Sequence, residues 1–131
     1  MRYLIDTDYV ADFLKGRTDA MHLLRGLPRD EIAISMITYG EVIEGITFGQ
    51  DRQRHERGFR QFLRIADVLP LSRTTMRCFA DMRGMLRGQG SLIPDMDLLT
   101  GATVLATHRT LVTRNRRHFR RLQAFGLTVH P

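Results

Sequence analysis

The sequence predicts an α/β fold in which a mostly parallel β-sheet is flanked by helices on both faces. Short apolar runs, the first of them Tyr3–Ile5, alternate along the chain with longer segments whose apolar residues recur at helical spacing. Such alternation is typical of a parallel sheet covered on both sides. The 131 residues suffice for one domain with a substantial core, and we expect residues 1–131 to form it.

The first half of the chain predicts two strands and four helices. Residues 3–5 and 32–34 are the strands, since both are short, apolar and followed at once by polar residues. Thr7 or Asp8 is expected to cap the first helix, which ends at Gly16. The other helices are expected from Thr18 to Pro28, from Ser35 or Thr38 to about Ile46, and over 50–66.

The second half predicts three more strands and three more helices. Residues 68–69, 110–113 and 127–129 are short apolar runs bounded by Pro, Asn or polar residues. Residues 74–87 have a helical apolar stripe that ends at Gly88. Pro94 suits the first turn of a further helix, and acidic residues are favoured beside it. Phe119, Leu122 and Phe125 predict one last helix.

Composition and charge limit the class of protein. No run of about 18 apolar residues occurs, so we expect no transmembrane helix, and Asp6 within the first apolar run argues against a signal peptide. The single Cys78 cannot form an internal disulfide, which favours a reducing, cytoplasmic location. The net charge of +6 favours a polyanionic partner, although a codon preference could also explain why Lys15 is the only lysine among twenty basic residues.

Several polar residues are predicted at the carboxyl ends of strands or at the helix starts beside them. Ligands of open α/β sheets bind at that edge. Carboxylates crowded there repel one another unless a divalent cation lies between them, and oxygen ligands suit Mg²⁺ or Mn²⁺. The pattern therefore predicts a metal-dependent nuclease, the alternative being helix caps and surface ion pairs. The residues are Asp6, Glu41, Asp95, Asp97, Thr113 and Asn115.

Four segments together resemble a PIN domain, and within that group the VapC toxins of bacterial VapBC toxin–antitoxin modules. They are YLIDTDYV, SMITYGEVIEG, IPDMDLLTGATVLA and TLVTRNRRHF, which occur in the family's order and span almost the whole chain. The resemblance implies a compact PIN-like α/β fold with a central parallel sheet. It also implies a metal-dependent endoribonuclease that uses Mg²⁺ or Mn²⁺ and leaves a 3′-hydroxyl and a 5′-phosphate.

Position by position, the resemblance assigns the catalytic and metal-binding acids to Asp6, Glu41 and Asp97. The family's fourth position falls on Asn115, a departure from the acid that PIN domains often have there, and its amide could hold a metal-bound water. Asp95 could be a further ligand, a water-orienting group or a helix cap. Thr7 could hold Asp6 or donate to the substrate phosphate.

Partners follow from the same resemblance. It implies a VapB-like antitoxin whose C-terminal segment covers the active site, a homodimer, and an RNA substrate such as tRNA or rRNA. Arg114, Arg116 and Arg117 are the expected RNA contacts, the alternative being solvated charges at a helix start. His118 is expected at the surface with no role.

Two other functions fit parts of the sequence. Asp6-Thr7-Asp8 after a strand also resembles the DxD start of haloacid dehalogenase-like phosphatases, but these need a late lysine and Lys15 comes too early. The other alternative is a non-catalytic PIN-like module that only binds RNA or a partner. The neutral Asn115 favours that alternative, whereas the three remaining carboxylates oppose it.

Overall fold

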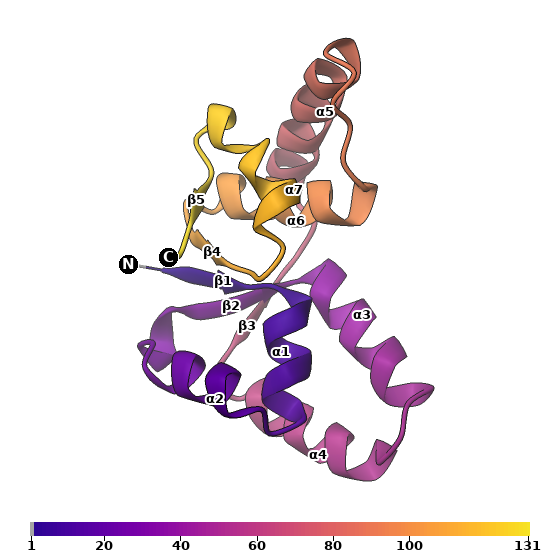
Figure 1. Ribbon diagram of the computed structural model, residues 1–131, viewed down its shortest axis with the longest axis vertical. Coiled ribbons are helices and arrows are strands. Elements are labelled where there is room, and N and C mark those ends of the chain that lie inside the picture. The colour runs from indigo at the N-terminus through magenta and orange to yellow at the C-terminus, as the bar shows by residue number, and fades with distance from the viewer. Residues whose placement is uncertain (1) are drawn as a thin grey trace.

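A five-stranded parallel sheet forms the centre of the protein in the computed structural model, which describes residues 2–131 (Figure 1). The strand order is β3-β2-β1-β4-β5, which confirms the predicted parallel α/β fold. Because β1 lies between β2 and β4, the order reverses there, and ligands of such sheets bind at that reversal. The strands are β1 (Tyr3–Ile5), β2 (Ile32–Ser35), β3 (Asp67–Leu69), β4 (Thr110–Val112) and β5 (Thr128–Val129).

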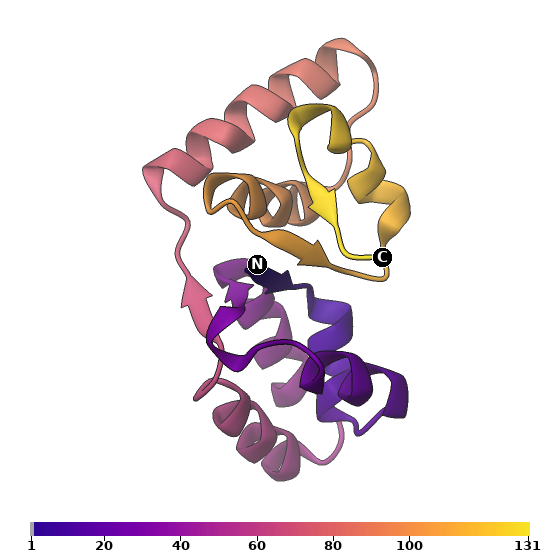
Figure 2. The same ribbon diagram turned by 90° about the vertical axis from the view of Figure 1, so that its left-hand side faces the viewer.

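Helices cover both faces of the sheet (Figures 1 and 2). One face carries α1 (Thr7–Leu14), α2 (Thr18–Arg25), α3 (Met36–Thr47) and α4 (Arg52–Phe62). The other carries α5 (Arg73–Gly88), α6 (Asp95–Ala106) and α7 (Arg116–Arg120). Two short 3₁₀ turns, η1 (Arg29–Glu31) and η2 (Gln123–Phe125), complete the elements of residues 2–131. None of the helices in this range is long and apolar enough to cross a membrane.

The two central strands supply both hydrophobic cores, because successive side chains of a strand point to opposite faces. Ile5 and Val112 pack with the α1–α4 layer, whereas their neighbours Leu4 and Leu111 pack with the α5–α7 layer. All four side chains are almost completely buried. This burial on both sides fixes the ends of β1 and β4, where the predicted site residues follow.

Three predicted helices are shorter than expected. The helix predicted from Thr18 to Pro28 is α2, which ends at Arg25 with Gly26 as its C-cap. The helix predicted over 50–66 is α4, which ends at Phe62, because the chain must turn through residues 63–66 before β3 begins at Asp67. The last predicted helix is divided into α7 and η2, and Gly126 then adopts a left-handed conformation with φ of 99° to enter β5. Hydrophobic spacing alone did not reveal these turns, since apolar residues continue through them.

Gly101 allows α6 to lie close to the segment that follows α7. A Cβ atom at this position would lie 2.4 Å from Cδ1 of Leu122, so a larger residue would require that side chain to move. Leu122 itself is fully buried in the α5–α7 layer. The close packing places α7 over α6, and this arrangement brings residues 115–118 to the start of α6.

Candidate active site

Asp6 lies directly after β1 and joins the two central strands to the start of α1. Its backbone N donates to Val112 O of β4 at 2.9 Å, and its Oδ1 accepts from Thr7 N at 2.8 Å. Asp6 is therefore the N-cap of α1. The prediction that Thr7 or Asp8 caps this helix is wrong, because the helix begins immediately after the strand. Only 7% of the Asp6 surface is exposed.

Glu41 reaches the same region from the second turn of α3. Ser35 caps α3 by accepting from Thr38 N at 3.0 Å, which fixes the start of the helix. Thr7 Oγ1 donates to Glu41 Oε1 at 2.6 Å and lies 3.0 Å from Thr38 Oγ1. Thr7 thus contacts Asp6 through its backbone and Glu41 through its hydroxyl.

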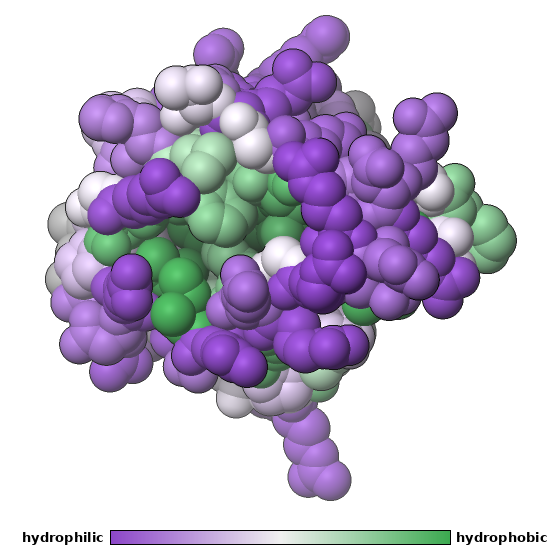
Figure 3. Space-filling model, turned by 90° about the horizontal axis from the view of Figure 1, so that it is seen from below, coloured by the Kyte–Doolittle hydropathy of each residue, from purple (hydrophilic) through white to green (hydrophobic). Residues whose placement is uncertain are grey.

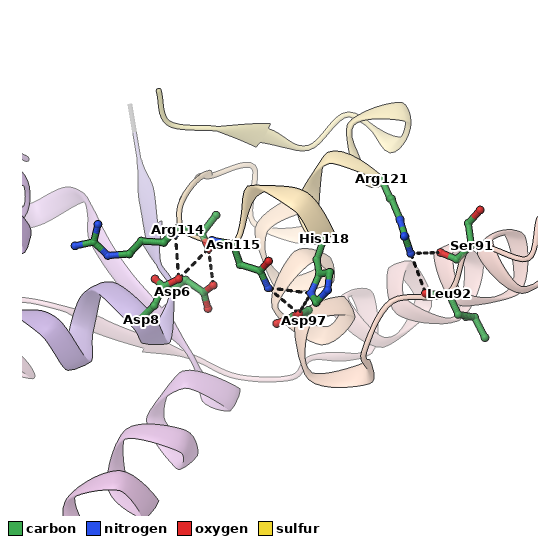
Figure 4. Close-up of polar contacts among 10 residues, drawn as sticks. Asp6, Asp8, Ser91, Leu92, Asp97, Arg114, Asn115, His118 and Arg121 are labelled. Carbon is green, nitrogen blue, oxygen red and sulfur yellow. Dashed lines mark hydrogen bonds and ion pairs between the residues drawn. The ribbon is translucent and has the colours of Figure 1, made fainter.

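Asp97 lies in the first turn of α6 and is held by two side chains from the segment after β4 (Figure 4). Its Oδ2 is 2.6 Å from His118 Nδ1 and 3.2 Å from Asn115 Nδ2. The Asn115 amide donates to this oxygen, and His118 donates to it as well in the tautomer that carries hydrogen on Nδ1. Oδ1 has no such partner within residues 2–131 and remains available to a ligand.

Thr113 connects the Asp6 side of the site with the Asp97 side. Its hydroxyl donates to Asp6 Oδ2 at 2.7 Å and accepts from Asn115 N at 3.0 Å. A continuous series of hydrogen bonds therefore runs from Glu41 through Asp6 to Asp97. The three carboxylates predicted from the resemblance are held in one network, although each comes from a different helix.

Burial makes the negative charge of Asp6 unfavourable in the free protein. Desolvation raises its pKa from 3.8 to about 6, and the charges of Asp8 and Asp97 act in the same direction. Hydrogen bonds from Thr113 and Thr7 lower the pKa but do not offset the burial. Burial also raises the pKa of Asp8. A cation placed beside these carboxylates would relieve this repulsion.

The donor set fits a hard divalent cation. Within residues 2–131, no arginine or lysine forms an ion pair with Asp6, Glu41 or Asp97. Among the same residues, no group of three Asp, Glu, His or Cys side chains lies close enough together to hold a metal ion. Mg²⁺ usually keeps several waters and takes one or two carboxylates, so it does not require such a cluster.

Asp95 differs from the other predicted carboxylates. Its Oδ1 accepts from Arg83 Nε at 3.0 Å, and more than half of its side chain is exposed. It is the first residue of α6, whereas Pro94 occupies the cap position without a side-chain bond, so the capping role predicted for Asp95 is wrong. Proline followed by acidic residues suits this helix start through its dipole instead.

Arg114 contacts protein carboxylates in the free protein. Its guanidinium bonds Asp12 at 3.1 Å and Asp19 at 2.7 Å, and lies 4.2 Å from the centre of the Tyr9 ring. Its backbone N donates to Asp8 Oδ2 at 3.0 Å (Figure 4). These contacts fasten the segment after β4 to α1 and α2, so Arg114 has a structural role that the sequence did not indicate.

The other two predicted RNA contacts differ from each other. Arg116 Nη2 donates to His130 O at 2.9 Å and so ties α7 to the chain end. Arg117 is exposed and makes no ion pair within the part of the chain that the structure describes. Of the three arginines, Arg117 is therefore the one whose guanidinium is available to a phosphate.

His118 was expected at the surface without a role, and the structure corrects this. It is half-buried and its Nδ1 contacts Asp97. Arg121, one turn further, donates to Ser91 O at 3.3 Å and Leu92 O at 3.0 Å and so holds the segment before α6 (Figure 4). The three-residue spacing from Asn115 to His118, which places both on one helix face, was the signal that could have revealed the pair.

The raised pKa of Asp6 predicts how its replacement changes stability with pH. In the metal-free protein, the pKa of Asp6 is 3.8 in the unfolded chain and about 6 in the folded one. The protonated carboxyl therefore stabilises the fold fully below pH 3.8, and this stabilisation is lost as the pH rises through 6. Asp6→Asn removes this loss. Between pH 4 and 7.5 the free energy of unfolding of the variant, relative to wild type, should therefore rise by roughly 2–3 kcal/mol.

Urea unfolding in EDTA at both pH values measures this difference. The matched control is Asp81→Asn, which removes an exposed carboxylate from α5. A difference between Asp6→Asn and wild type that stays constant across the pH range would contradict the desolvated state of Asp6.

Comparison with known proteins identifies the family. Residues 3–124 match the family model described as PIN domain. Ribonuclease VapC1 of Methanocaldococcus jannaschii is 30% identical over 129 residues, which are 98% of this chain and 87% of that protein. Ribonuclease VapC1 of Haemophilus influenzae is 27% identical over 93% of this chain and 92% of its own length.

Solved structures agree with this family. The VapBC-1 structure from nontypeable Haemophilus influenzae has a TM-score of 0.84 and 26% identity, and the match covers 99% of this chain and 97% of that chain. VapBC2 from Rickettsia felis, bound to a DNA fragment from its promoter, shares the fold with a TM-score of 0.88 and 24% identity over 99% and 98% of the two chains. Since family model and relatives cover nearly all of the sequence, the chain belongs to the PIN-domain family and, within it, to the VapC group.

Proposed function

We propose that this protein is the toxin of a type II toxin–antitoxin pair and that it acts as a metal-dependent endoribonuclease. The observation that carries the proposal is the hydrogen-bonded series joining Glu41, Asp6 and Asp97 at the ends of the central strands. These carboxylates lie at the reversal of strand order, where α/β proteins bind ligands. The relatives named ribonuclease VapC support the same activity.

Each side chain has a distinct role in this proposal. Asp6, Glu41 and Asp97 would hold Mg²⁺ or Mn²⁺, which supplies Lewis-acid stabilisation and an activated water for attack on the phosphodiester. Thr113 keeps Asp6 oriented, and Thr7 does the same for Glu41. We expect a 3′-hydroxyl and a 5′-phosphate as products, with a tRNA or rRNA as substrate.

Asn115 orients the Asp97 carboxylate from a position where many PIN domains have an acidic residue. Its amide N donates to Asp97 Oδ2 at 3.2 Å, so it fixes a neighbouring carboxylate and adds no negative charge of its own. This use of the amide differs from the expected hold on a metal-bound water. With one carboxylate fewer than many PIN domains, the site attracts a cation through Asp6, Glu41 and Asp97, with Asp95 as an outer candidate.

A VapB-like antitoxin is the proposed partner, because the similar solved structure from Haemophilus influenzae is a VapBC structure. A groove of about 590 Å³ between α2 and α4 suits an apolar segment of such a partner. Figure 3 shows this face as an apolar hollow surrounded by hydrophilic side chains. Leu24 and Phe62 line the groove together with Arg25 and Arg29, whose charges favour a segment that carries acidic residues.

Other expectations from the sequence remain predictions: the homodimer, the cytoplasmic location and the single domain over residues 1–131. The phosphatase alternative is set aside, since the chain belongs to the PIN-domain family. A non-catalytic PIN-like binding module is the remaining alternative, and it makes a different prediction for the cleavage experiment.

RNA cleavage by the purified protein, freed of antitoxin, tests the activity. Total tRNA and rRNA are incubated with Mg²⁺, Mn²⁺ or EDTA, and cut sites are mapped by sequencing. Cleavage should require metal and fall by at least ~100-fold in Asp6→Asn and Asp97→Asn, since each variant removes a charge that holds the ion. The control Asp81→Asn should cleave like wild type. Binding of RNA without cleavage under any condition would favour the binding module.

Loss of the His118 contact should weaken metal binding by about 10-fold or more, because hydrogen-bonded partners of metal ligands typically contribute 10–100-fold to affinity. His118→Ala removes the donor to Asp97, whereas His118→Asn keeps a donor near the position of Nδ1 and should lose less. Titration of the RNA-free protein with Mn²⁺, followed by electron paramagnetic resonance, measures the affinity. His22→Ala, an exposed histidine of α2, is the matched control, and equal affinity of His118→Ala and wild type would refute the role.

Reversal of a groove charge should weaken antitoxin binding. Arg25→Glu places a negative charge beside the proposed acidic segment and should lower the affinity for the co-expressed antitoxin by about tenfold or more. Arg87→Glu is the matched control, because both arginines are exposed and lie in the last turn of a helix. Calorimetry measures both affinities, and equal binding by the two variants would place the antitoxin elsewhere.

A further inference from the structure

A small cavity lies beside Glu41, next to the carboxylate network. It encloses about 140 Å³ between α1, α3 and α4. Thr7 and Glu41, which share a 2.6 Å hydrogen bond, belong to its lining, so the cavity is continuous with the carboxylate network. Val42 and Ile46 of α3 form a buried apolar floor.

We propose that this cavity binds one unpaired nucleobase of the RNA, next to the phosphodiester that is cut. The proposal rests on the proposed nuclease function and names a feature of its substrate. About 140 Å³ is the liquid volume of roughly five waters and lies well below the roughly 300 Å³ of pockets for larger ligands. A single planar ring system matches this size, whereas a peptide helix does not.

The lining has the chemistry that nucleobase recognition requires. Ring faces pack on the apolar floor, and polar groups at the rim meet the edge of the base and the backbone phosphate. Lys15, the only lysine of the chain, and His55 both border the cavity. Neither forms an ion pair within residues 2–131, so both can donate to an incoming nucleotide.

Gly45 keeps the wall of the cavity open. It lies inside α3, where glycine costs about 1 kcal/mol relative to alanine. A Cβ atom at this position would meet no heavy atom within 4 Å, so packing does not demand glycine. A side chain there would instead occupy the hollow, which makes Gly45 the position from which the cavity can be filled without disturbing the core.

The position of the cavity also predicts the state of the RNA. Glu41 belongs to both the cavity lining and the carboxylate network, so a base in the cavity would lie beside a phosphate held by the carboxylates. A base that enters a cavity must leave its stack and its pairing partner, which costs least in single-stranded loops.

Nuclear magnetic resonance titration of the full-length protein tests the cavity without catalysis. The four nucleoside 5′-monophosphates are added in EDTA, and ribose 5-phosphate is added in parallel as the probe without a base. At least one nucleotide should shift the signals of Gly45, Lys15 and His55, whereas ribose 5-phosphate should leave the Gly45 signal unchanged. Gly45→Leu should weaken that binding at least tenfold. Gly84→Leu is the matched control, because Gly84 is also an exposed helix glycine with open space around its Cβ position.

The possible outcomes separate this inference from the nuclease proposal. Equal shifts with ribose 5-phosphate would show an anion site only and overturn the inference, as would unchanged binding by Gly45→Leu. RNA cleavage without any nucleotide response at the cavity would overturn the inference and leave the nuclease. Nucleotide binding that Gly45→Leu abolishes, in a protein that cuts no RNA, would support the base site and overturn the nuclease.

Discussion

The buried carboxylate of Asp6 is the group on which the rest of the site depends. Its backbone bonds β4, its Oδ1 caps α1, and its Oδ2 accepts from Thr113. The two central strands and the first helix therefore meet at one residue, and the apolar burial of β1 and β4 holds that residue in place. The same burial raises its pKa, so the fold itself creates the unfavourable charge that a cation would relieve.

The distribution of charge explains how a basic protein can keep an acidic site. The chain carries a net charge of +6, yet Arg114, which follows β4 beside the site, is held by Asp12 and Asp19 and lies over the Tyr9 ring. Within residues 2–131, Asp6, Glu41 and Asp97 therefore form no ion pair with arginine. A basic surface attracts a polyanion over long distances, whereas an uncompensated acidic centre attracts a metal ion at short range.

The sequence predicted the site residues whose positions are set locally, at the end of a strand or near the start of a helix. Asp6 follows a buried strand and Asp97 opens a helix after proline, so their positions follow from neighbours in the chain. The contact of His118 with Asp97 depends instead on how α7 lies over α6, which local spacing alone does not encode. The ion pairs of Arg114 likewise depend on Asp12 of α1 and Asp19 of α2, which lie 102 and 95 residues earlier in the chain.

Helix α1 connects the three features proposed for this protein. Its first residue follows the Asp6 cap, and Leu14 near its end lines both the groove proposed for the antitoxin and the cavity proposed for the nucleobase. A partner that fills the groove would therefore contact the same helix whose first turn positions Asp6 and Thr7.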